Sequence, residues 1–179
     1  MLGLFRRKRH ERAGFALYTA AVRAARDPWF YTALGVPDTL DGRFDLVGVH
    51  VFLIIDRLQE APEPGPGLAQ ALFDAMFADM DFNLREMGVG DMSVGKRVKE
   101  MWEAFHGRAV VYAAALQCDD DAALVQALAR NVWRGEAPAG APEALAALMR
   151  RHDVALADMP TASFDGEAFR FPAAETVQA

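Results

Sequence analysis

Five polar residues are the first candidates for chemistry in this sequence. Asp74, Asp79, Asp81 and Glu86 recur along one predicted helix, and His50 lies within another. Carboxylates and histidines that project inward from neighbouring helices can bridge two metal ions, but such sites take a Glu-x-x-His motif from each of two helices. The sequence does not meet that requirement, and charged residues on helices are usually solvated. These residues therefore favour an ordinary helix surface over a metal centre.

The remaining candidates for chemistry each have a simpler structural interpretation. The glycine-rich run GVGDMSVGK at 88–96 lacks the spacing of a phosphate-binding loop, and it follows a helix rather than a strand. Cys118 has no activating base beside it and is expected to be a small, partly buried residue. The acidic triplet Asp119–Asp121 is expected to cap a helix N-terminus, where acids complement the helix dipole. His50, within an apolar helix, is expected to be a hydrogen-bonded core or interface histidine. The sequence predicts no catalytic residue, no metal and no cofactor, and hence a protein that is not an enzyme.

Length and composition are those of one globular domain. The chain has 179 residues, of which 53% are hydrophobic and 25% are charged, and a domain of this size buries about 70% of the surface of its unfolded chain. No apolar run approaches the roughly 20 residues that a membrane-spanning helix needs. The single cysteine excludes an internal disulfide, and the start has no apolar segment followed by a small-residue cleavage site. We therefore expect a soluble protein in a reducing compartment.

Basic residues are concentrated at the N-terminus. Residues 1–26 contain seven basic residues and one acidic residue, a net charge of +6; the whole chain carries −6, so residues 27–179 carry −12. We expect residues 1–11 to be a flexible basic arm that contacts either an anionic membrane or RNA, and not DNA. A solvated terminus without a partner is the alternative. The residues of this arm expected to make the contact are Arg6, Arg7, Lys8, Arg9 and Arg12.

Apolar residues recur at helical spacing along almost the whole chain, which predicts an all-α fold. The predicted helices lie around residues 15–22, 29–34, 44–58, 73–87, 94–116 and 122–132, with a last one following residue 142. Turn-forming residues predict a rigid loop at 36–42 and a proline-rich connection at 61–67. We expect a single domain of about six to seven helices at 12–155, followed by an irregular tail at 156–179.

Residues 71–108 form the most informative segment. Two apolar stripes at helical spacing are joined by a turn containing Gly88 and Gly90, with Ser93 as the expected N-cap of the second helix, so the two helices should pack antiparallel. Acidic residues before the turn give way to Lys96 and Arg97 after it, and Trp102 lies at the edge of the second stripe. Because tryptophan and arginine dominate binding hot spots, this segment predicts a docking surface; a Trp at the edge of the core with ordinary surface charges is the alternative.

Two long motifs resemble a known family. FYTALGVPDTLDGRFDL at 30–46 and ALFDAMFADMDFNLREMGVGDMSVGKRVKEMWEAFHGR at 71–108, with the helix between them, are similar to the ubiquinol-cytochrome c chaperone family. The resemblance covers roughly residues 12–116, and the alanine-rich portion after Cys118 adds no comparable support. The mitochondrial members of that family assist assembly of the cytochrome bc1 complex. They engage newly made cytochrome b near the ribosome and the inner membrane, together with a small partner protein.

The resemblance implies a non-enzymatic assembly chaperone that binds cytochrome b or another bc1 subunit. Because the basic start runs directly into the family region, with no cleavable mitochondrial presequence, we expect a bacterial member that acts in the cytoplasm at the inner face of the membrane. A ribosome or a small partner protein is a further expected contact. Two sets of charged residues match the family's motifs and are predicted to bind client or partner: Asp38, Asp41 and Arg43 in the first motif, and Asp79, Asp81, Arg85, Glu86, Asp91, Lys96 and Arg97 in the second. Trp102 joins them as the aromatic edge, and Lys96, Arg97 and Trp102 are our main hypothesis for client contact.

Two other functions stay open at this point. One is an enzyme of quinone or haem metabolism with a carboxylate metal site, which bound iron in the purified protein would favour. The other is an RNA- or ribosome-binding adaptor that works through residues 6–12, which a strong salt dependence lost on deleting the arm would favour.

Overall fold

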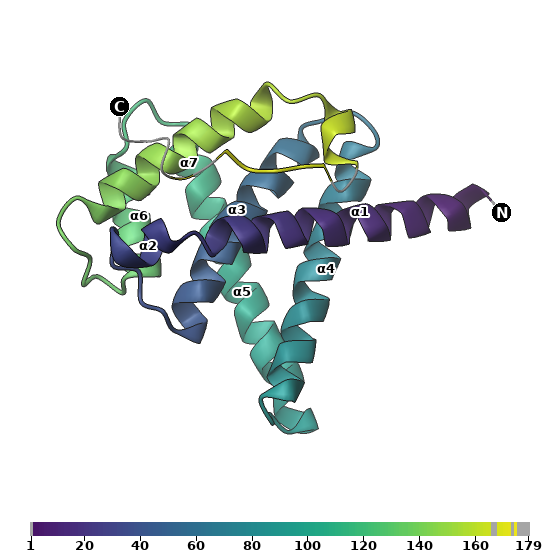
Figure 1. Cartoon of the computed structure of the whole chain (residues 1–179), viewed down its shortest axis with the longest axis horizontal. Coiled ribbons are helices and arrows are strands. Elements are labelled where there is room, and N and C mark those ends of the chain that lie inside the picture. The colour runs from purple at the N-terminus through teal and green to yellow at the C-terminus, as the bar shows by residue number, and fades with distance from the viewer. Residues whose placement is uncertain (1, 166–167, 173, 175–179) are drawn as a thin grey trace.

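The fold is built from helices alone in the part of the chain that the structure describes (Figure 1). This computed structural model describes residues 2–165, 168–172 and 174, with side chains from residue 7 onward. Its elements are α1 (Leu2–Ala25), α2 (Pro28–Thr32), α3 (Leu40–Gln59), α4 (Gly65–Glu86), α5 (Asp91–Leu116), α6 (Ala122–Val132), α7 (Ala141–Ala157) and the 3-10 turn η1 (Thr161–Phe164). The predicted all-α, single-domain class is confirmed.

Helix α3 forms the centre of the molecule. It contacts α1, α4, α5, α6 and α7, and both Val51 and Ile54 are fully buried. A helix that is apolar on most of its circumference must be enclosed by other elements. The Thr39 side chain accepts a hydrogen bond from the Gly42 amide at 3.2 Å and caps this helix. The central helix is therefore fixed at its start by a local cap and along its length by packing.

Helix α1 crosses α4 and α3 and projects beyond them at its N-terminal end (Figure 1). A Cβ on Gly14 would lie 2.5 Å from the backbone of Ala71, so only glycine permits this close crossing. The helix begins at Leu2, and residues 2–11, expected as a flexible arm, continue it as further helical turns.

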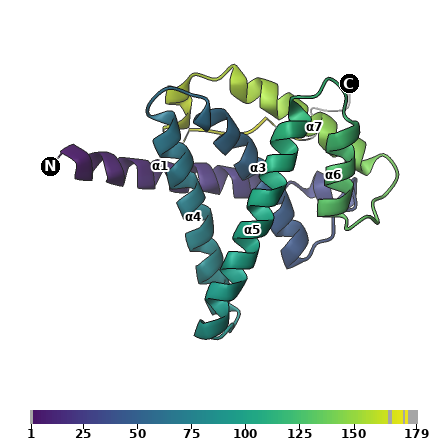
Figure 2. The ribbon, with the colours of Figure 1, turned by 180° about the vertical axis from the view of Figure 1, so that it is seen from behind.

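Helices α4 and α5 form an antiparallel hairpin that extends away from the body (Figure 2), as predicted. Phe77 of α4 lies against Phe105 of α5, with ring centroids 6.4 Å apart. Gly88 adopts a φ of +79° in the turn, a conformation that favours glycine. The predicted N-cap was wrong: Gly90 precedes the helix, and Ser93 lies in its first turn, because the backbone bends at the glycines.

The two predicted connections are shorter than expected. Helix α3 begins at Leu40, within the loop predicted at 36–42, because Thr39 supplies an N-cap. Helix α4 begins at Gly65, within the connection predicted at 61–67, and carries Pro66 in its first turn. Proline is tolerated there because the first helical amides have no intrahelical partner.

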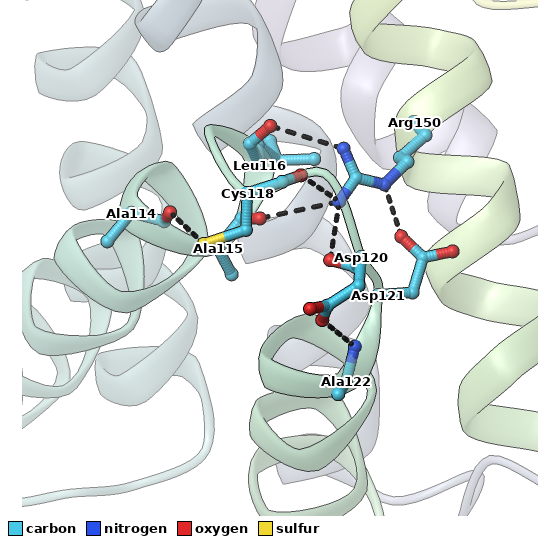
Figure 3. A network of polar contacts seen from close by, with 8 residues as sticks. All are labelled: Ala114, Ala115, Leu116, Cys118, Asp120, Asp121, Ala122 and Arg150. Atoms are coloured by element: carbon cyan, nitrogen blue, oxygen red, sulfur yellow. Dashed lines mark hydrogen bonds and ion pairs between the residues drawn. The ribbon is translucent and has the colours of Figure 1, made fainter.

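Arg150 of α7 joins the end of α5 to the start of α6 (Figure 3). Its guanidinium donates to the carbonyl oxygens of Leu116 and Cys118 and forms an ion pair with Asp121. The acidic triplet does lie at a helix N-terminus as predicted: the Asp120 carboxylate accepts from the Ala122 amide at 2.9 Å, while the side chain of the N-cap residue Asp121 pairs with Arg150. Cys118 is exposed and not partly buried, because the chain leaves α5 just before it.

The described part of the C-terminal segment returns to the core. Helix α7 continues to Ala157, past the predicted start of the irregular tail at residue 156, and η1 follows it. Phe164 and Phe169 are buried and stacked, with ring centroids 5.2 Å apart. Phe171 packs on the buried rings of His50 and His152. The described residues after η1 are irregular but form part of the core's cover.

Candidate functional site

An open groove lies between α3, α4 and α5, and we refer to it as the α5 groove. Its volume is about 520 Å³. It is lined by Phe52, Ile55, Asp56, Gln59, Pro66, Ala69, Gln70, Phe73, Trp102, Phe105, His106, Ala109, Val110 and Ala113. Most of these side chains are apolar or aromatic, so the groove presents a continuous apolar surface to solvent. Such surfaces on soluble proteins mark sites of interaction with other molecules.

One wall of the α5 groove is a ridge of three side chains. Trp102, His106 and Val110 are spaced four residues apart on α5 and therefore share one helical face. Trp102 stacks on His106 with an interplanar angle of 4°. Trp102 is 43% exposed and Val110 is 58% exposed. The ridge is half-open to solvent, although its side chains are of types that usually fill cores.

The floor of the groove is aromatic and largely rigid. Phe73 and Phe105 lie with ring centroids 6.1 Å apart, and Phe52 packs edge-on against Tyr112. Phe52 and Phe105 are buried beneath the groove. Aromatic floors offer a large apolar contact area at little cost in conformational entropy.

A carboxylate, that of Asp56, lies at the other end of the groove. Because α4 and α5 are antiparallel and Phe73 faces Phe105, the beginning of α4 lies beside residues 109–113 of α5, far from Trp102. Asp56 and Gln59 lie at this end. Partial burial, and then the nearby carboxylates of Glu60 and Asp153, raise the pKa of Asp56 above its ordinary 3.8. No ion pair of the described residues involves Asp56 or Glu60.

The charges predicted for the hairpin turn are largely paired with one another. Arg85 donates to Asp81 and to Asp91, each at 2.6 Å, and so ties the end of α4 to the start of α5. Asp79 accepts from the Tyr18 hydroxyl at 2.7 Å and links the hairpin to α1. Glu86 is exposed. Arg85, Asp81 and Asp91 therefore hold the turn together, which gives them a structural role in addition to any binding role.

The basic residues after the turn remain accessible. Lys96 lies 3.9 Å from Glu100 in a loose, exposed pair, and the ion pairs of the described residues do not include Arg97. Three apolar side chains at the same tip are also exposed: Phe82, Met87 and Met92. Met87 lies near the end of the helix predicted at 73–87, but it follows the last residue of α4 and is exposed.

The first family motif forms a separate local cluster. Arg43 donates to Asp38 at 2.6 Å, and this contact lowers the pKa of Asp38. Asp41 lies exposed in the first turn of α3. Gly42 is required sterically, because a Cβ would lie 2.1 Å from the Pro37 carbonyl oxygen. None of the described contacts of these residues reaches the hairpin, so the structure does not unite the two predicted sets into one site.

The basic residues near the N-terminus lie along α1. Arg7 pairs with Glu11 at 3.0 Å, and Arg9 pairs with Asp165 of the C-terminal segment. Lys8 is exposed, Arg12 lines an open cleft between α1 and α4, and the side chain of Arg6 falls outside the described residues. That cleft has a larger volume, about 830 Å³, but charges of both signs line it and partly pair, as Arg7 does with Glu11. The α5 groove is the better candidate because aromatic side chains line it and, among its described lining residues, Asp56 alone is a carboxylate.

Two polar residues of α3 are deeply buried. Both Arg108 and Arg134 donate to the carboxylate of Asp45, which is 4% exposed. Burial raises the pKa of Asp45, and the two guanidinium groups oppose that change. His50 is 1% exposed and shares a 2.8 Å hydrogen bond with the Leu46 carbonyl, as a core histidine should. Burial lowers the pKa of His50 to about 4.

The described residues do not assemble the metal site considered from the sequence. They contain no group of three or more His, Cys, Asp or Glu side chains placed to hold a metal ion. His50 lies beneath Phe171, whereas Asp74 accepts from Gln70 and Asp81 pairs with Arg85. One Glu-x-x-His sequence does exist, from Glu103 to His106 on α5, but Glu103 pairs with Lys99 there.

The helices of the described residues are not suited to crossing a bilayer, since each falls short in either length or apolar character.

Sequence reasoning identified Trp102 but missed the groove that it borders. The four-residue spacing of Trp102, His106 and Val110 was a usable signal, because it marks a second apolar face on α5. Asp56 and Asp45 were also missed. An aspartate inside an otherwise apolar helical run is a signal for a buried or functional carboxylate.

Comparison with known proteins relates the chain to one family. A family model described as ubiquinol-cytochrome C chaperone matches residues 32–171. Two relatives named ubiquinol-cytochrome c reductase complex assembly factor 1, from Xenopus laevis and Homo sapiens, are each 24% identical over 122 residues, or 68% of this chain. The chain covers 58% of the frog protein and 39% of the human protein, so it spans well under two thirds of their length. The crystal structure of the Cbp3 homolog from Brucella abortus matches with a TM-score of 0.85 and 34% identity, over 99% of both chains.

Proposed function

We propose that this protein, which belongs to the ubiquinol-cytochrome c chaperone family, assists assembly of the ubiquinol-cytochrome c reductase complex by holding newly made cytochrome b. The family match carries this proposal, because it extends over residues 32–171 and so includes the α5 groove and the hairpin. The names of the frog and human relatives refer to assembly of the same complex.

The chemistry of the α5 groove supports a holding role. A subunit of a membrane complex exposes apolar surface until its partners cover it, and apolar surface in water favours aggregation. The groove offers an apolar, aromatic contact surface with Trp102 and Val110 at its rim. Binding of that kind needs no covalent step and no cofactor, and it is reversible, so the client can be released to its partner subunits.

We assign the client contact to the α5 groove together with the basic start of α5. Trp102 would supply an aromatic anchor, and Lys96 and Arg97 would add long-range attraction to acidic parts of a client. Arg85 and the carboxylates that it pairs with would hold the turn in shape. Asp38, Asp41 and Arg43 form a second surface that a bc1 subunit or small partner protein would contact.

We further propose that the protein works in the cytoplasm at the inner face of the membrane, with the basic side of α1 directed toward anionic lipid or a ribosome. Lys8 is exposed there, and each basic residue near an anionic surface contributes about 1 kcal/mol at most. Replacing Arg7 and Lys8 with glutamine should reduce sedimentation with anionic vesicles or with ribosomes, and unchanged sedimentation with both would remove this part of the proposal.

The test of the main proposal is deletion of the gene in the source cell. The expected result is a selective loss of assembled, haem-containing cytochrome b from membranes, measured by its absorbance, with an unrelated respiratory complex unchanged. The intact gene should restore it. A normal bc1 complex in the deletion strain would contradict the proposal and leave the family relation as a statement about fold.

A further inference from the structure

The α5 groove is apolar at one end and acidic at the other. Trp102, Phe73 and Phe105 form the apolar end, and Asp56 forms the acidic end. Glu60 and Asp153 lie close enough to Asp56 to raise its pKa, so three carboxylates share this region. Each negative charge disfavours the charged form of its neighbour, whereas an opposite charge nearby favours it.

The nearest basic side chains do not neutralise this acidic end. Arg57 follows Asp56 in sequence, but its guanidinium donates to the carbonyl oxygens of Leu156 and Met159, at 2.9 and 3.0 Å. Arg150 lies near Asp153, but it is held by Asp121 and by the carbonyls at the end of α5. Among the described residues, His106 supplies the imidazole that lines the groove, and it stacks on Trp102 in the ridge. Asp56 and Glu60 therefore have no ion-pair partner among the described residues, and Arg150 offsets only the charge of Asp153.

The dimensions of the groove suit a short stretch of helix. Trp102 and Val110 are eight residues apart on α5, which corresponds to about 12 Å at a rise of about 1.5 Å per residue. A bound helix of about two to three turns would cover this apolar ridge. An occupant that also satisfied Asp56 would carry a positive charge immediately after its apolar stretch.

We infer that the α5 groove recognises the boundary of a membrane helix, where an apolar stretch ends and lysine or arginine residues begin. This inference rests on the proposed function and specifies the client's chemistry. Cytoplasmic ends of membrane helices carry an excess of basic residues, so such a boundary is a common feature of membrane subunits. The apolar turns lie against Trp102 and Val110, and the basic flank lies at Asp56 and Glu60. An apolar helix without that flank leaves the carboxylates unpaired.

The test uses the full-length protein and fluorescent peptides that share one 11-residue leucine- and alanine-based helical core. The core carries three basic, three glutamine or three acidic residues, placed at the N-terminal flank in one set and at the C-terminal flank in another. Dissociation constants are measured by anisotropy at low and at physiological salt. In at least one orientation, the basic peptide should bind about tenfold more tightly than the glutamine peptide, and more salt should reduce that preference.

Two double variants separate recognition from general charge. Asp56→Asn with Glu60→Gln should abolish the preference for the basic flank while leaving affinity for the glutamine peptide unchanged. Glu136→Gln with Glu143→Gln removes the same charge from exposed acids outside the groove and should leave the preference intact. Circular dichroism checks that both variants are folded.

Equal binding of basic and acidic peptides in both orientations, or an equal loss of preference in both double variants, would overturn the inference. So would tight binding that is unaffected by Trp102→Ala, because the peptides would then occupy another surface. Each of these results concerns peptide chemistry alone. The gene deletion experiment would still decide separately whether the protein assists bc1 assembly.

Discussion

Asp45 and Asp56 lie eleven residues apart on the same helix and are held in opposite ways. Asp45 is buried and accepts from two arginines, Arg108 of α5 and Arg134 of the segment that follows α6. Asp56 is half-buried and faces the carboxylates of Glu60 and Asp153. Burial raises the pKa of both side chains, but only for Asp45 do neighbouring cations oppose the change.

The contrast distinguishes charges that build the fold from charges that the fold leaves available. Asp45 connects α3 with α5 and with the segment after α6, and its partners already satisfy it. Asp56 and Glu60, at the acidic end of the α5 groove, form no ion pair with the described residues, and they lie beside an exposed apolar surface. We propose that a basic client segment pairs with these carboxylates.

The largest effect on the free energy of unfolding should come from removing Asp45, whose charge is paired in the fold. Asp45→Ala leaves two arginines without their acceptor in a mostly buried site, and breaking a buried ion pair costs about 3–5 kcal/mol. Urea unfolding followed by circular dichroism should report a loss of this size. Asp56→Ala serves as the comparison, and a similar loss in that variant would mean that both aspartates are structural.

His50, which lies between these two aspartates on α3, should make the fold sensitive to acid. Burial lowers the pKa of His50 from 6.5 to about 4. The unfolded chain then binds a proton more readily than the folded one, so stability is complete above about pH 6.5 and falls as the pH drops toward 4. The loss assigned to His50 is about 3 kcal/mol at pH 4. The pKa of the neighbouring His152 is also lowered by burial to about 4. His50→Asn retains a donor for Leu46 and should therefore reduce, without abolishing, the fall of the unfolding free energy with acid; an unaltered profile would contradict a neutral, buried His50.

The apolar rim of the α5 groove should matter for client binding more than an equally exposed residue elsewhere. Val110 is 58% exposed in the groove and Val154 is 62% exposed on α7, so they form a matched pair. Val110→Asn should weaken peptide binding and lower cytochrome b levels several-fold, consistent with a loss of about 1 kcal/mol of apolar contact. Val154→Asn should leave both unchanged, and equal effects of the two variants would remove the groove from the account.

Relief of the unsatisfied acidic cluster should stabilise the fold slightly. Because the pKa of Asp56 is raised, the folded protein binds this proton more tightly than the unfolded chain, and stability falls as the pH rises through that range. Asp56→Asn removes the repulsion and should add about 0.5 kcal/mol at pH 7, with no gain at pH 3. Thermal unfolding at the two pH values measures the difference. A destabilised variant would show that Asp56 has a favourable partner in the fold.

The smallest effect on stability should come from the basic start of α5. Lys96→Glu with Arg97→Glu breaks only the loose pair with Glu100 and should change stability by less than about 0.5 kcal/mol. If these residues attract a client, the variant should slow client association and weaken its dependence on salt. Unchanged folding, association and bc1 assembly would remove Lys96 and Arg97 from the client contact.

The sequence predicted the helices because their apolar spacing reflects burial directly. The hairpin, the cap at Asp120 and the core position of His50 follow from rules that act within a few residues. Helix starts were less predictable, because several residues near each start could serve as its cap. Thr39 begins α3 within a predicted loop, and Gly90 precedes α5 in place of the predicted Ser93. The helical turns at residues 2–11 were not predicted, because side chains that hold them, Arg9 and Asp165, are far apart in sequence.

The candidate site was predictable only in part, because part of it is formed by residues that are distant in sequence. Trp102 and the charged turn are adjacent in sequence, and their types alone indicated a surface. The α5 groove forms only where three helices meet. The charges that surround Asp45 and Asp56 also come from distant parts of the chain, up to 97 positions away in the case of Asp56 and Asp153. Spacing within one helix cannot reveal such contacts.

Site-specific crosslinking is the most direct test of the central claim that the α5 groove holds newly made cytochrome b. A photoreactive amino acid is placed at Val110 in one strain and at Val154 in another, and crosslinked proteins are identified during active synthesis of the complex. The account predicts that cytochrome b is crosslinked from position 110 and not from position 154. Crosslinks to cytochrome b from position 154 alone, or from neither position while the protein still supports assembly, would contradict it.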